Sequence, residues 1–186
     1  MSVPRHRLDT QTNHPRGPRT REHLRSLDET SKDVNHGSAT LNFVATVLLA
    51  SDLASLRREL ETVLAGPDID IVEASSGVET VARVIEGGVD LVVVDLQIGS
   101  MGGMAITMEL RNLESYGGAE PVSVLMLLDR RPDVFLARRS GADGFLVKPL
   151  DPQRLRSAVR ALLRGEGYED QSLRPATVRV GSTDAR

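Results

Sequence analysis

Residues 90–103 read DLVVVDLQIGSMGG, an apolar run that ends at Asp95 and is followed by a loop with two adjacent glycines. Four consecutive apolar residues with a sharp polar end are typical of a strand that is buried on both faces of a parallel sheet. In an open sheet of this kind, ligands and chemistry collect at the carboxyl ends of the strands. Asp95 is therefore the first candidate for a functional residue.

Two more apolar runs end in the same way, one on each side of this stretch. Residues 47–50 lead through Ser51 into Asp52, and residues 145–147 lead into Lys148. If these runs are parallel strands of one sheet, their carboxyl ends lie at the same edge. The sequence thus predicts that two carboxylates and one lysine meet at that edge.

Strand and helix patterns alternate along the middle of the chain. Five segments have the length and apolar content of buried strands: 44–50, 69–74, 91–94, 122–128 and 144–147. Amphipathic segments with helical spacing follow them at 53–64, 78–85, 104–113, 132–139 and 152–163. This alternation implies right-handed crossovers and a parallel sheet that is covered on both faces. We therefore expect a five-stranded, doubly wound α/β fold.

The composition indicates where the folded domain begins and ends and in which compartment the protein is expected. Apolar periodicity is confined to residues 41–165, so we expect 1–40 to be a disordered arm and 166–186 a disordered tail. The chain has no cysteine, which excludes disulfides and thiolate metal sites, and its net charge of -3 argues against nucleic acid as the main partner. No apolar run approaches the roughly 20 residues of a membrane-spanning helix, and no secretory signal is evident. A cytoplasmic location is the expectation.

Three segments together resemble the receiver domain of two-component response regulators: VLLASDLASLRR at 47–58, DLVVVDLQIGSMGG at 90–103 and GADGFLVKPL at 141–150. The resemblance covers residues 46–164 and implies a flavodoxin-like (βα)5 fold with strand order 2-1-3-4-5. It also implies that Asp95 accepts a phosphoryl group from a sensor histidine kinase or a phosphotransfer protein. We expect no enzymatic activity of its own and no catalytic residue in that sense.

The chemistry of such a site explains the residue types. A carboxylate attacks phosphorus only when the repulsion between the two anions is neutralised, and Mg²⁺ does this with carboxylate, water and phosphate oxygens as ligands. Asp52 and Asp95 fit that requirement, and the resemblance adds the backbone carbonyl of Gln97 as a third ligand. It also implies that Lys148 pairs first with Asp95 and later with the phosphoryl oxygens. Pro149 would form the cis peptide bond that aims this lysine.

Three positions that receivers use for metal binding and switching are altered. Ser51 stands where the family has a second acid, so we expect weak Mg²⁺ binding. Leu128 stands where the family has a hydroxyl that couples phosphorylation to a conformational change, and Phe145 occupies the aromatic switch position without a hydroxyl. In the loop after the third strand, Gly99 and Gly102 replace the customary proline and aspartate, which favours a more mobile loop.

Two functions remain open at this point. The retained acids and lysine favour a stand-alone receiver that is phosphorylated in a phosphorelay and signals to an unknown downstream protein. Ser51 and Leu128 favour the alternative, a phosphorylation-independent pseudo-receiver that serves as a protein-interaction module. Asp52 also has a purely structural interpretation, because an aspartate at the start of a helix can cap it. No helix-turn-helix pattern follows residue 163, so no DNA-binding domain is expected.

Overall fold

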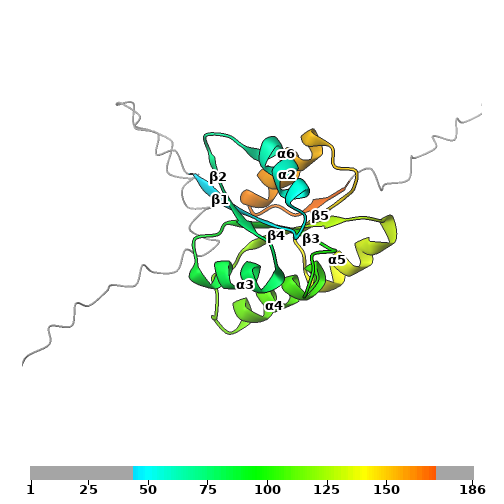
Figure 1. The fold of residues 1–186 in the computed structure, drawn as a ribbon. Helices are drawn as coiled ribbons and strands as arrows, with labels where there is room; N and C mark the ends of the chain where they lie inside the picture. The colour runs from blue at the N-terminus through cyan, green and yellow to red at the C-terminus, as the bar shows by residue number, and fades with distance from the viewer. Residues whose placement is uncertain (1–43, 171–186) are drawn as a thin grey trace, which may run out of the picture.

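A parallel β-sheet lies between two layers of helices (Figure 1). The computed structural model describes residues 44–170, so the arm expected at 1–40 and the tail after 170 lie outside the described residues. The elements follow one another in the order β1 (Ala45–Ala50), α2 (Ala54–Leu64), β2 (Ile69–Ala74), α3 (Gly77–Glu86), β3 (Leu91–Asp95), α4 (Gly103–Ser115), β4 (Ser123–Leu128), the 3-10 turn η1 (Arg131–Asp133), α5 (Val134–Ser140), β5 (Gly144–Val147), α6 (Pro152–Leu163) and β6 (Tyr168–Glu169). All the strands and helices expected from the sequence are therefore present.

The strands pair in the order β2-β1-β3-β4-β5-β6, and every pair is parallel. The predicted order 2-1-3-4-5 is confirmed, but the sheet has a sixth strand where five were expected. In β6, Tyr168 lies opposite Gly144 and Glu169 lies opposite Phe145. The domain expected to end at residue 165 thus extends to residue 170. A strand of two residues is too short to show an alternating pattern in the sequence.

Two glycines allow close backbone contacts that shape the sheet. A Cβ atom at Gly144 would lie 2.8 Å from the carbonyl oxygen of Tyr168, so a side chain there would push β6 away from β5. A Cβ atom at Gly103 would lie 2.6 Å from the carbonyl oxygen of Asp95, where the start of α4 passes over the end of β3. Both positions need a residue without a side chain.

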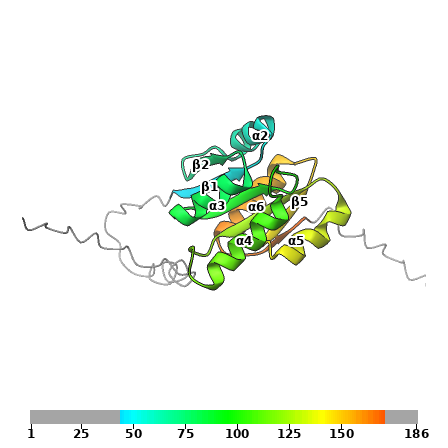
Figure 2. The ribbon, with the colours of Figure 1, turned by 60° about the horizontal axis from the view of Figure 1, so that its bottom comes forward.

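The helices cover both faces of the sheet. Figures 1 and 2 show α2 and α6 on one face and α3, α4 and α5 on the other. Successive strand residues point to opposite faces. In β1, Val47 and Leu49 pack in the cluster under α2 and α6, whereas Leu48 and Ala50 pack in the cluster under the other layer. Burial on both faces explains why the strands are continuous apolar runs in the sequence.

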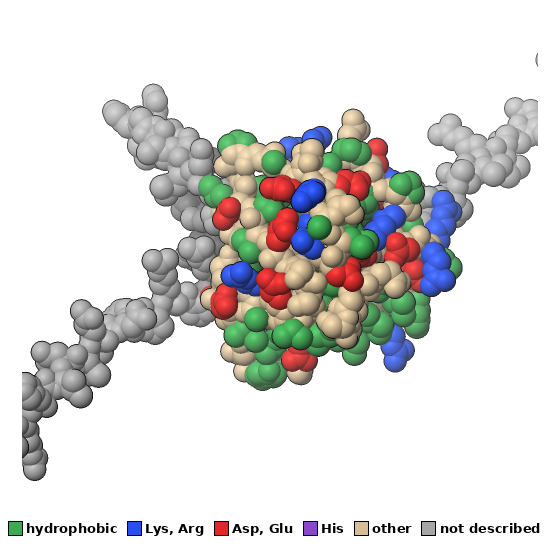
Figure 3. Space-filling view, viewed as in Figure 1, with side chains coloured by type: hydrophobic (Ala, Val, Ile, Leu, Met, Phe, Trp, Pro, Cys, Tyr) green, Lys and Arg blue, Asp and Glu red, His purple; other side chains and the backbone are tan. Residues whose placement is uncertain are grey.

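The outer surface of α3 and α4 carries exposed apolar side chains. Figure 3 shows hydrophobic groups gathered along the lower side of the visible face, over these helices, with acids and bases mixed above them. The large exposed hydrophobic residues here are Val78 and Ile85 of α3, Met108 of α4 and Tyr116, which directly follows α4. They do not form a membrane segment, since no helix within residues 44–170 is long and apolar enough to cross a bilayer.

Candidate functional site

The carboxyl ends of β1, β3 and β5 bring the predicted site residues to one edge of the sheet. Ala50 at the end of β1 lies opposite Val94, so Ser51 and Asp52 follow directly beside Asp95. Lys148 follows β5, and its Nζ lies 2.9 Å from Oδ1 of Asp95. The residues that the apolar runs placed at strand ends therefore do lie at one edge, with Asp95 and Lys148 in direct contact.

Asp95 is buried, and three donors surround its carboxylate. Only 1% of its surface is exposed. Oδ1 accepts hydrogen bonds from Lys148 Nζ at 2.9 Å and from the backbone N–H of Gln97 at 3.3 Å, and Oδ2 accepts one from the Ser51 hydroxyl at 3.3 Å. A buried carboxylate is costly unless it is paired and hydrogen-bonded in this way. The site thus holds an anionic oxygen pair at the end of a rigid central strand.

Ser51 contributes to the site through its hydroxyl rather than through charge. Its side chain is fully buried, donates to Asp95, and accepts a hydrogen bond from the backbone N–H of Leu53 at 3.2 Å. The hydroxyl therefore links the end of β1 to the phosphoacceptor candidate. It adds no negative charge for a cation.

Asp52 is exposed and ties two loops together. Its Oδ2 accepts a hydrogen bond from the backbone N–H of Gly99 at 3.1 Å, which connects the loop after β1 to the loop after β3. The residue at the cap position of α2 is Leu53, and no side-chain hydrogen bond caps this helix. A Cβ atom at Gly99 would lie 2.9 Å from the Asp52 carboxylate, so the glycine permits this approach. Asp52 therefore connects the two loops and does not cap α2.

Lys148 is held between two carboxylates. Besides Asp95, its Nζ contacts Oδ1 of Asp129 at 3.1 Å, and the peptide bond between Lys148 and Pro149 is cis, as the resemblance implied. Burial lowers the pKa of Lys148, but the hydrogen bonds to Asp95 and Asp129 raise it by more, so the pKa lies above its ordinary value. The ammonium group is therefore charged throughout the physiological pH range.

Sequence reasoning gave no role to Asp129. The signal was present, because Asp129 directly follows the apolar run of β4, as Asp95 ends that of β3. An acid at the carboxyl end of any strand of the sheet belongs to the same edge.

The two altered switch positions are both buried. Leu128 is fully buried at the end of β4, and its carbonyl oxygen accepts a hydrogen bond from the backbone N–H of Lys148 at 2.8 Å. Phe145 is 4% exposed, and the guanidinium carbon of Arg138 lies 5.8 Å from its ring centroid. Neither side chain offers a hydroxyl to the Asp95 carboxylate.

A buried ion pair from beyond the expected domain supports the strand that carries Lys148. Asp170 is 2% exposed, and its Oδ2 accepts a hydrogen bond from the backbone N–H of Val147 at 3.0 Å. Nη1 of Arg154 on α6 contacts both carboxylate oxygens of Asp170, at 2.9 and 2.8 Å. Nη2 of Arg154 donates to the carbonyl oxygen of Pro149 at 3.1 Å. The position of Lys148 therefore depends on the segment that follows α6.

The carboxylates available to a cation at this edge are few. Within residues 44–170, no group of three or more His, Cys, Asp or Glu side chains is placed to hold a metal ion. Mg²⁺ needs fewer protein ligands than that, because it is usually held by one or two carboxylates and completes its octahedron with water and phosphate oxygens. Asp52 and Asp95 fit a cation of this kind and do not form a dedicated all-protein cage.

Comparison with known proteins identifies the fold and the family. A family model, the response regulator receiver domain, matches residues 47–160. The chain belongs to this family. The match runs from β1 into α6, so it includes the strand ends that carry Asp52, Asp95 and Lys148. Receiver domains are in general signalling modules rather than enzymes, and they bind Mg²⁺ at the phosphorylation site.

Curated relatives of this receiver are longer proteins. The probable transcriptional regulator ycf27 of Porphyridium aerugineum is 32% identical over 118 residues, which cover 63% of this chain and 48% of the relative. The DNA-binding response regulator MtrA of Mycobacterium tuberculosis is 34% identical over 118 residues, with coverage of 63% and 50%. The nitrate/nitrite response regulator protein NarL of Escherichia coli is 32% identical over 133 residues, with coverage of 70% and 60%. The chain spans about half the length of the first two.

Solved structures show the same fold. The chemotaxis response regulator CheY4 of Vibrio cholerae superposes with a TM-score of 0.57 at 24% identity, covering 64% of this chain and 98% of that one. The receiver domain of Ssk1 of Saccharomyces cerevisiae, solved with the histidine phosphotransfer protein Ypd1, gives a TM-score of 0.57 at 24% identity, with coverage of 67% and 89%. These likenesses support the flavodoxin-like receiver fold.

Proposed function

We propose that Asp95 accepts a phosphoryl group from a histidine kinase or a histidine phosphotransfer protein, and that the modified domain then changes its protein contacts. The observation that carries this proposal is the buried Asp95 carboxylate in contact with Lys148, with Asp52 beside it. A buried ion pair is weak evidence for stability, because desolvation offsets most of its attraction. The pair is better explained by chemistry at this edge than by the needs of the fold.

In the proposed reaction, a carboxylate oxygen of Asp95 attacks the phosphorus of a phosphohistidine. The new O–P bond forms as the N–P bond breaks, and the departing imidazole takes up a proton from solvent. Lys148 stays protonated and offers its charge to the phosphoryl oxygens, as a point charge on a flexible stem. Asp95 needs no proton transfer of its own, because a carboxylate is already a nucleophile.

Asp52, Asp95 and the backbone carbonyl of Gln97 would hold Mg²⁺ in this reaction. When bound, the ion neutralises the charge between the carboxylates and the phosphoryl oxygens. Ser51 brings no charge, and its hydroxyl is already engaged by Asp95 and the Leu53 backbone. We therefore propose that Mg²⁺ binds weakly.

The class of partner is proposed from the family and from one structural neighbour. The receiver domain of Ssk1 was solved together with a histidine phosphotransfer protein, and a donor of that class suits this receiver as well. We also propose that the domain acts without an attached DNA-binding module, that it signals to a separate protein and that it works in the cytoplasm. Two relatives, ycf27 and MtrA, are about twice as long as the region over which they match this chain.

Phosphorylation can be tested directly. The protein is incubated with Mg²⁺ and acetyl phosphate, and intact mass is measured over time. We expect a gain of one phosphoryl group, its loss in Asp95→Asn, and slower labelling in Asp52→Asn. Glu120→Gln, an exposed acid in the loop before β4, is the matched control and should label normally. Absence of any mass gain would favour the pseudo-receiver, and labelling that persists in Asp95→Asn would remove Asp95 as the acceptor.

A further inference from the structure

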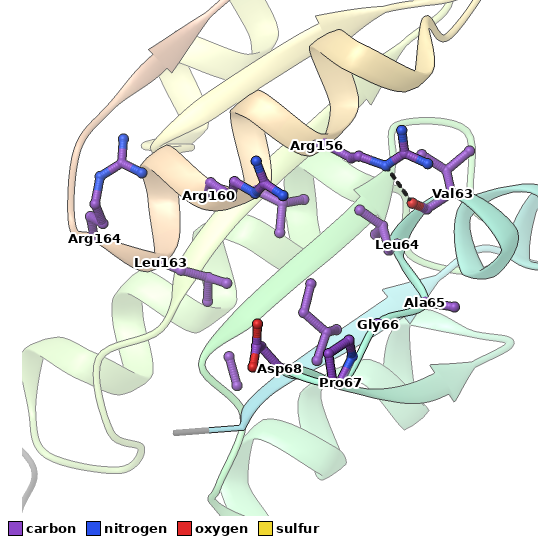
Figure 4. A pocket seen from close by; sticks show the side chains of 13 residues that line it. Val63, Leu64, Ala65, Gly66, Pro67, Asp68, Arg156, Arg160, Leu163 and Arg164 are labelled. Atoms are coloured by element: carbon purple, nitrogen blue, oxygen red, sulfur yellow. Dashed lines mark hydrogen bonds between the residues drawn. The ribbon is translucent and has the colours of Figure 1, made fainter. Parts of the chain in front are cut away.

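A cavity of about 380 Å³ lies at the opposite edge of the sheet from Asp95 (Figure 4). It opens between the carboxyl-terminal halves of α2 and α6, and the first residues of β1 and β2, Ala45 and Ile69, lie in its wall. Because the strands are parallel, this is the edge where they begin. A six-residue strand is about 17 Å long, so the cavity is well separated from the phosphorylation site.

Apolar and polar surface contribute about equally to the wall of the cavity. Leu64 of α2, Val159 and Leu163 of α6, and Ile69 of β2 face it, together with the turn at Pro67. Its volume falls within the range of about 300–1,000 Å³ that small-ligand sites occupy. A small ligand with an apolar body therefore has both the room and the surface to bind.

Three arginines of α6 line the same cavity at four-residue intervals. They are Arg156, Arg160 and Arg164, which share one side of the helix. Arg156 Nε donates to the carbonyl oxygen of Val63 at 2.9 Å, and Arg164 pairs with Glu166 at 2.8 Å. Within residues 44–170, the guanidinium of Arg160 makes no hydrogen bond or ion pair. Figure 4 shows Arg156 and Arg160 on the α6 side of the cavity, across from the turn that carries Asp68.

We propose that this cavity binds a small amphipathic anion, with its apolar body against Leu64 and Leu163 and its acidic head on the guanidinium of Arg160. A guanidinium presents its donors as a planar fork that fits a carboxylate or phosphate through paired hydrogen bonds. Asp68 is the single acid in the wall and opposes the binding of an anion. The inference is independent of phosphoryl transfer at Asp95.

The helix ends give Arg160 a decisive role. The carboxyl ends of α2 and α6 both lie near the cavity, and such ends carry partial negative charge. Without the guanidiniums, an anion would be repelled there. The apolar wall alone would accept a neutral ligand equally well, so the preference for a negative head is the property that distinguishes the proposal.

The test uses the full chain and three probes with the same apolar body: decanoate, decanol and decyltrimethylammonium. Binding is measured by calorimetry below the micelle concentration, and amide NMR shifts locate it. We expect decanoate to bind most tightly, with shifts at the ends of α2 and α6. Arg160→Gln should weaken decanoate about ten-fold, since a charge-assisted hydrogen bond contributes about that much affinity. Asp68→Asn should strengthen decanoate and leave decanol unchanged.

The controls separate this site from the rest of the molecule. Arg139→Gln, an exposed arginine of α5 on the other face, should bind decanoate like the unmodified protein. Asp95→Asn should also bind it normally, because the two sites lie at opposite edges. The proposal is overturned by absence of binding, by decanol or the cationic probe binding as tightly as decanoate, by an unchanged affinity in Arg160→Gln, or by shifts that map elsewhere.

Discussion

Lys148 divides its ammonium group between Asp95 and Asp129. Asp129 is partly exposed, with 38% of its side chain accessible, so its pairing with the lysine is worth at most about 1 kcal/mol. An incoming phosphoryl group meets the negative charge of both carboxylates. The second carboxylate therefore competes for the lysine and repels the substrate.

Replacing this competitor should speed modification. We expect Asp129→Asn to be labelled by acetyl phosphate up to about five-fold faster, the factor that corresponds to about 1 kcal/mol. The amide keeps an acceptor oxygen for Lys148 and loses only the charge. Initial rates by intact mass would show the effect, with Glu120→Gln as the unchanged control. A slower rate would mean that Asp129 helps to hold the lysine in place.

We predict that the neutral side chain of Ser51 limits the negative charge of the proposed Mg²⁺ site. We expect Ser51→Asp to tighten Mg²⁺ binding about ten-fold or more, which takes only about 1.4 kcal/mol of added attraction. Because Ser51 is fully buried beside Asp95, the new carboxylate should also lower the melting temperature when no Mg²⁺ is present. Calorimetric titration and melting curves measure both effects. Ser51→Asn is the control, because asparagine has nearly the shape of aspartate without its charge, and this variant should show neither effect. Equal Mg²⁺ affinities of Ser51→Asp and Ser51→Asn would exclude this position from the site.

We predict that Leu128 limits how strongly phosphorylation changes the structure. A modification shifts a conformational equilibrium only through contacts that differ between the two states, and this side chain has no hydroxyl to make one. We expect Leu128→Thr to increase the phosphorylation-dependent change in amide exchange over β4, β5, α5 and α6. The fully buried position should make this variant about 2–3 kcal/mol less stable.

The matched control for that experiment is Leu128→Val, which removes volume without adding a hydroxyl. It should lose about 1 kcal/mol and respond to phosphorylation as weakly as the unmodified protein. A full exchange response in the unmodified protein would contradict the weak coupling. An equal increase in the exchange response of Leu128→Thr and Leu128→Val would contradict the role of the missing hydroxyl.

The strands show which elements could be predicted from sequence. Burial on both faces makes β1, β3 and β4 continuous apolar runs, and the resemblance to receivers implied the order of the strands. The site residues at 52, 95 and 148 could be predicted for the same reason, since each stands at or directly after the end of such a run. β6 could not, because two residues are too few to show a period, although Tyr168 packs on the apolar cluster and the Asp170 ion pair directly follows the strand. Asp129 also directly follows an apolar run, so the rule that places Asp95 at the carboxyl ends of the strands places Asp129 there too.

β6 has only two residues, and we expect the ion pair between Arg154 and Asp170, which directly follows the strand, to stabilise it. We expect Asp170→Asn to lower the free energy of unfolding by about 2 kcal/mol, because the change takes the charged partner from the partly buried Arg154 and weakens the bond to Val147. Urea unfolding measures the loss. Glu169→Gln is the matched control: its pair with Arg138 is exposed on both sides and should be worth less than about 1 kcal/mol. Similar losses in the two variants would show that the Asp170 pair adds little.

The folded unit of the whole molecule should therefore end at residue 170 rather than at 165. A fragment of residues 39–170 should unfold with nearly the same free energy as the full chain, and it should be phosphorylated at the same rate. A fragment of residues 39–165 should be destabilised like Asp170→Asn and should be labelled more slowly, because the strand that leads to Lys148 loses its support. Urea unfolding and intact mass apply to both. Equal behaviour of the two fragments would place the boundary at 165 after all.

The presence of β6 also decides where another chain could join the sheet. Along β5, two residues pair with β6 and the backbone N–H of Val147 is taken by Asp170, so that side offers an incoming strand few free groups. At the other side, β2 is the open strand among the described residues, and its exposed Asp70 and Glu73 oppose strand addition by their charge. Association by edge-to-edge pairing is thus blocked on one side and discouraged on the other. Within residues 44–170, we therefore expect a partner that senses the proposed phosphorylation to bind helices and loops.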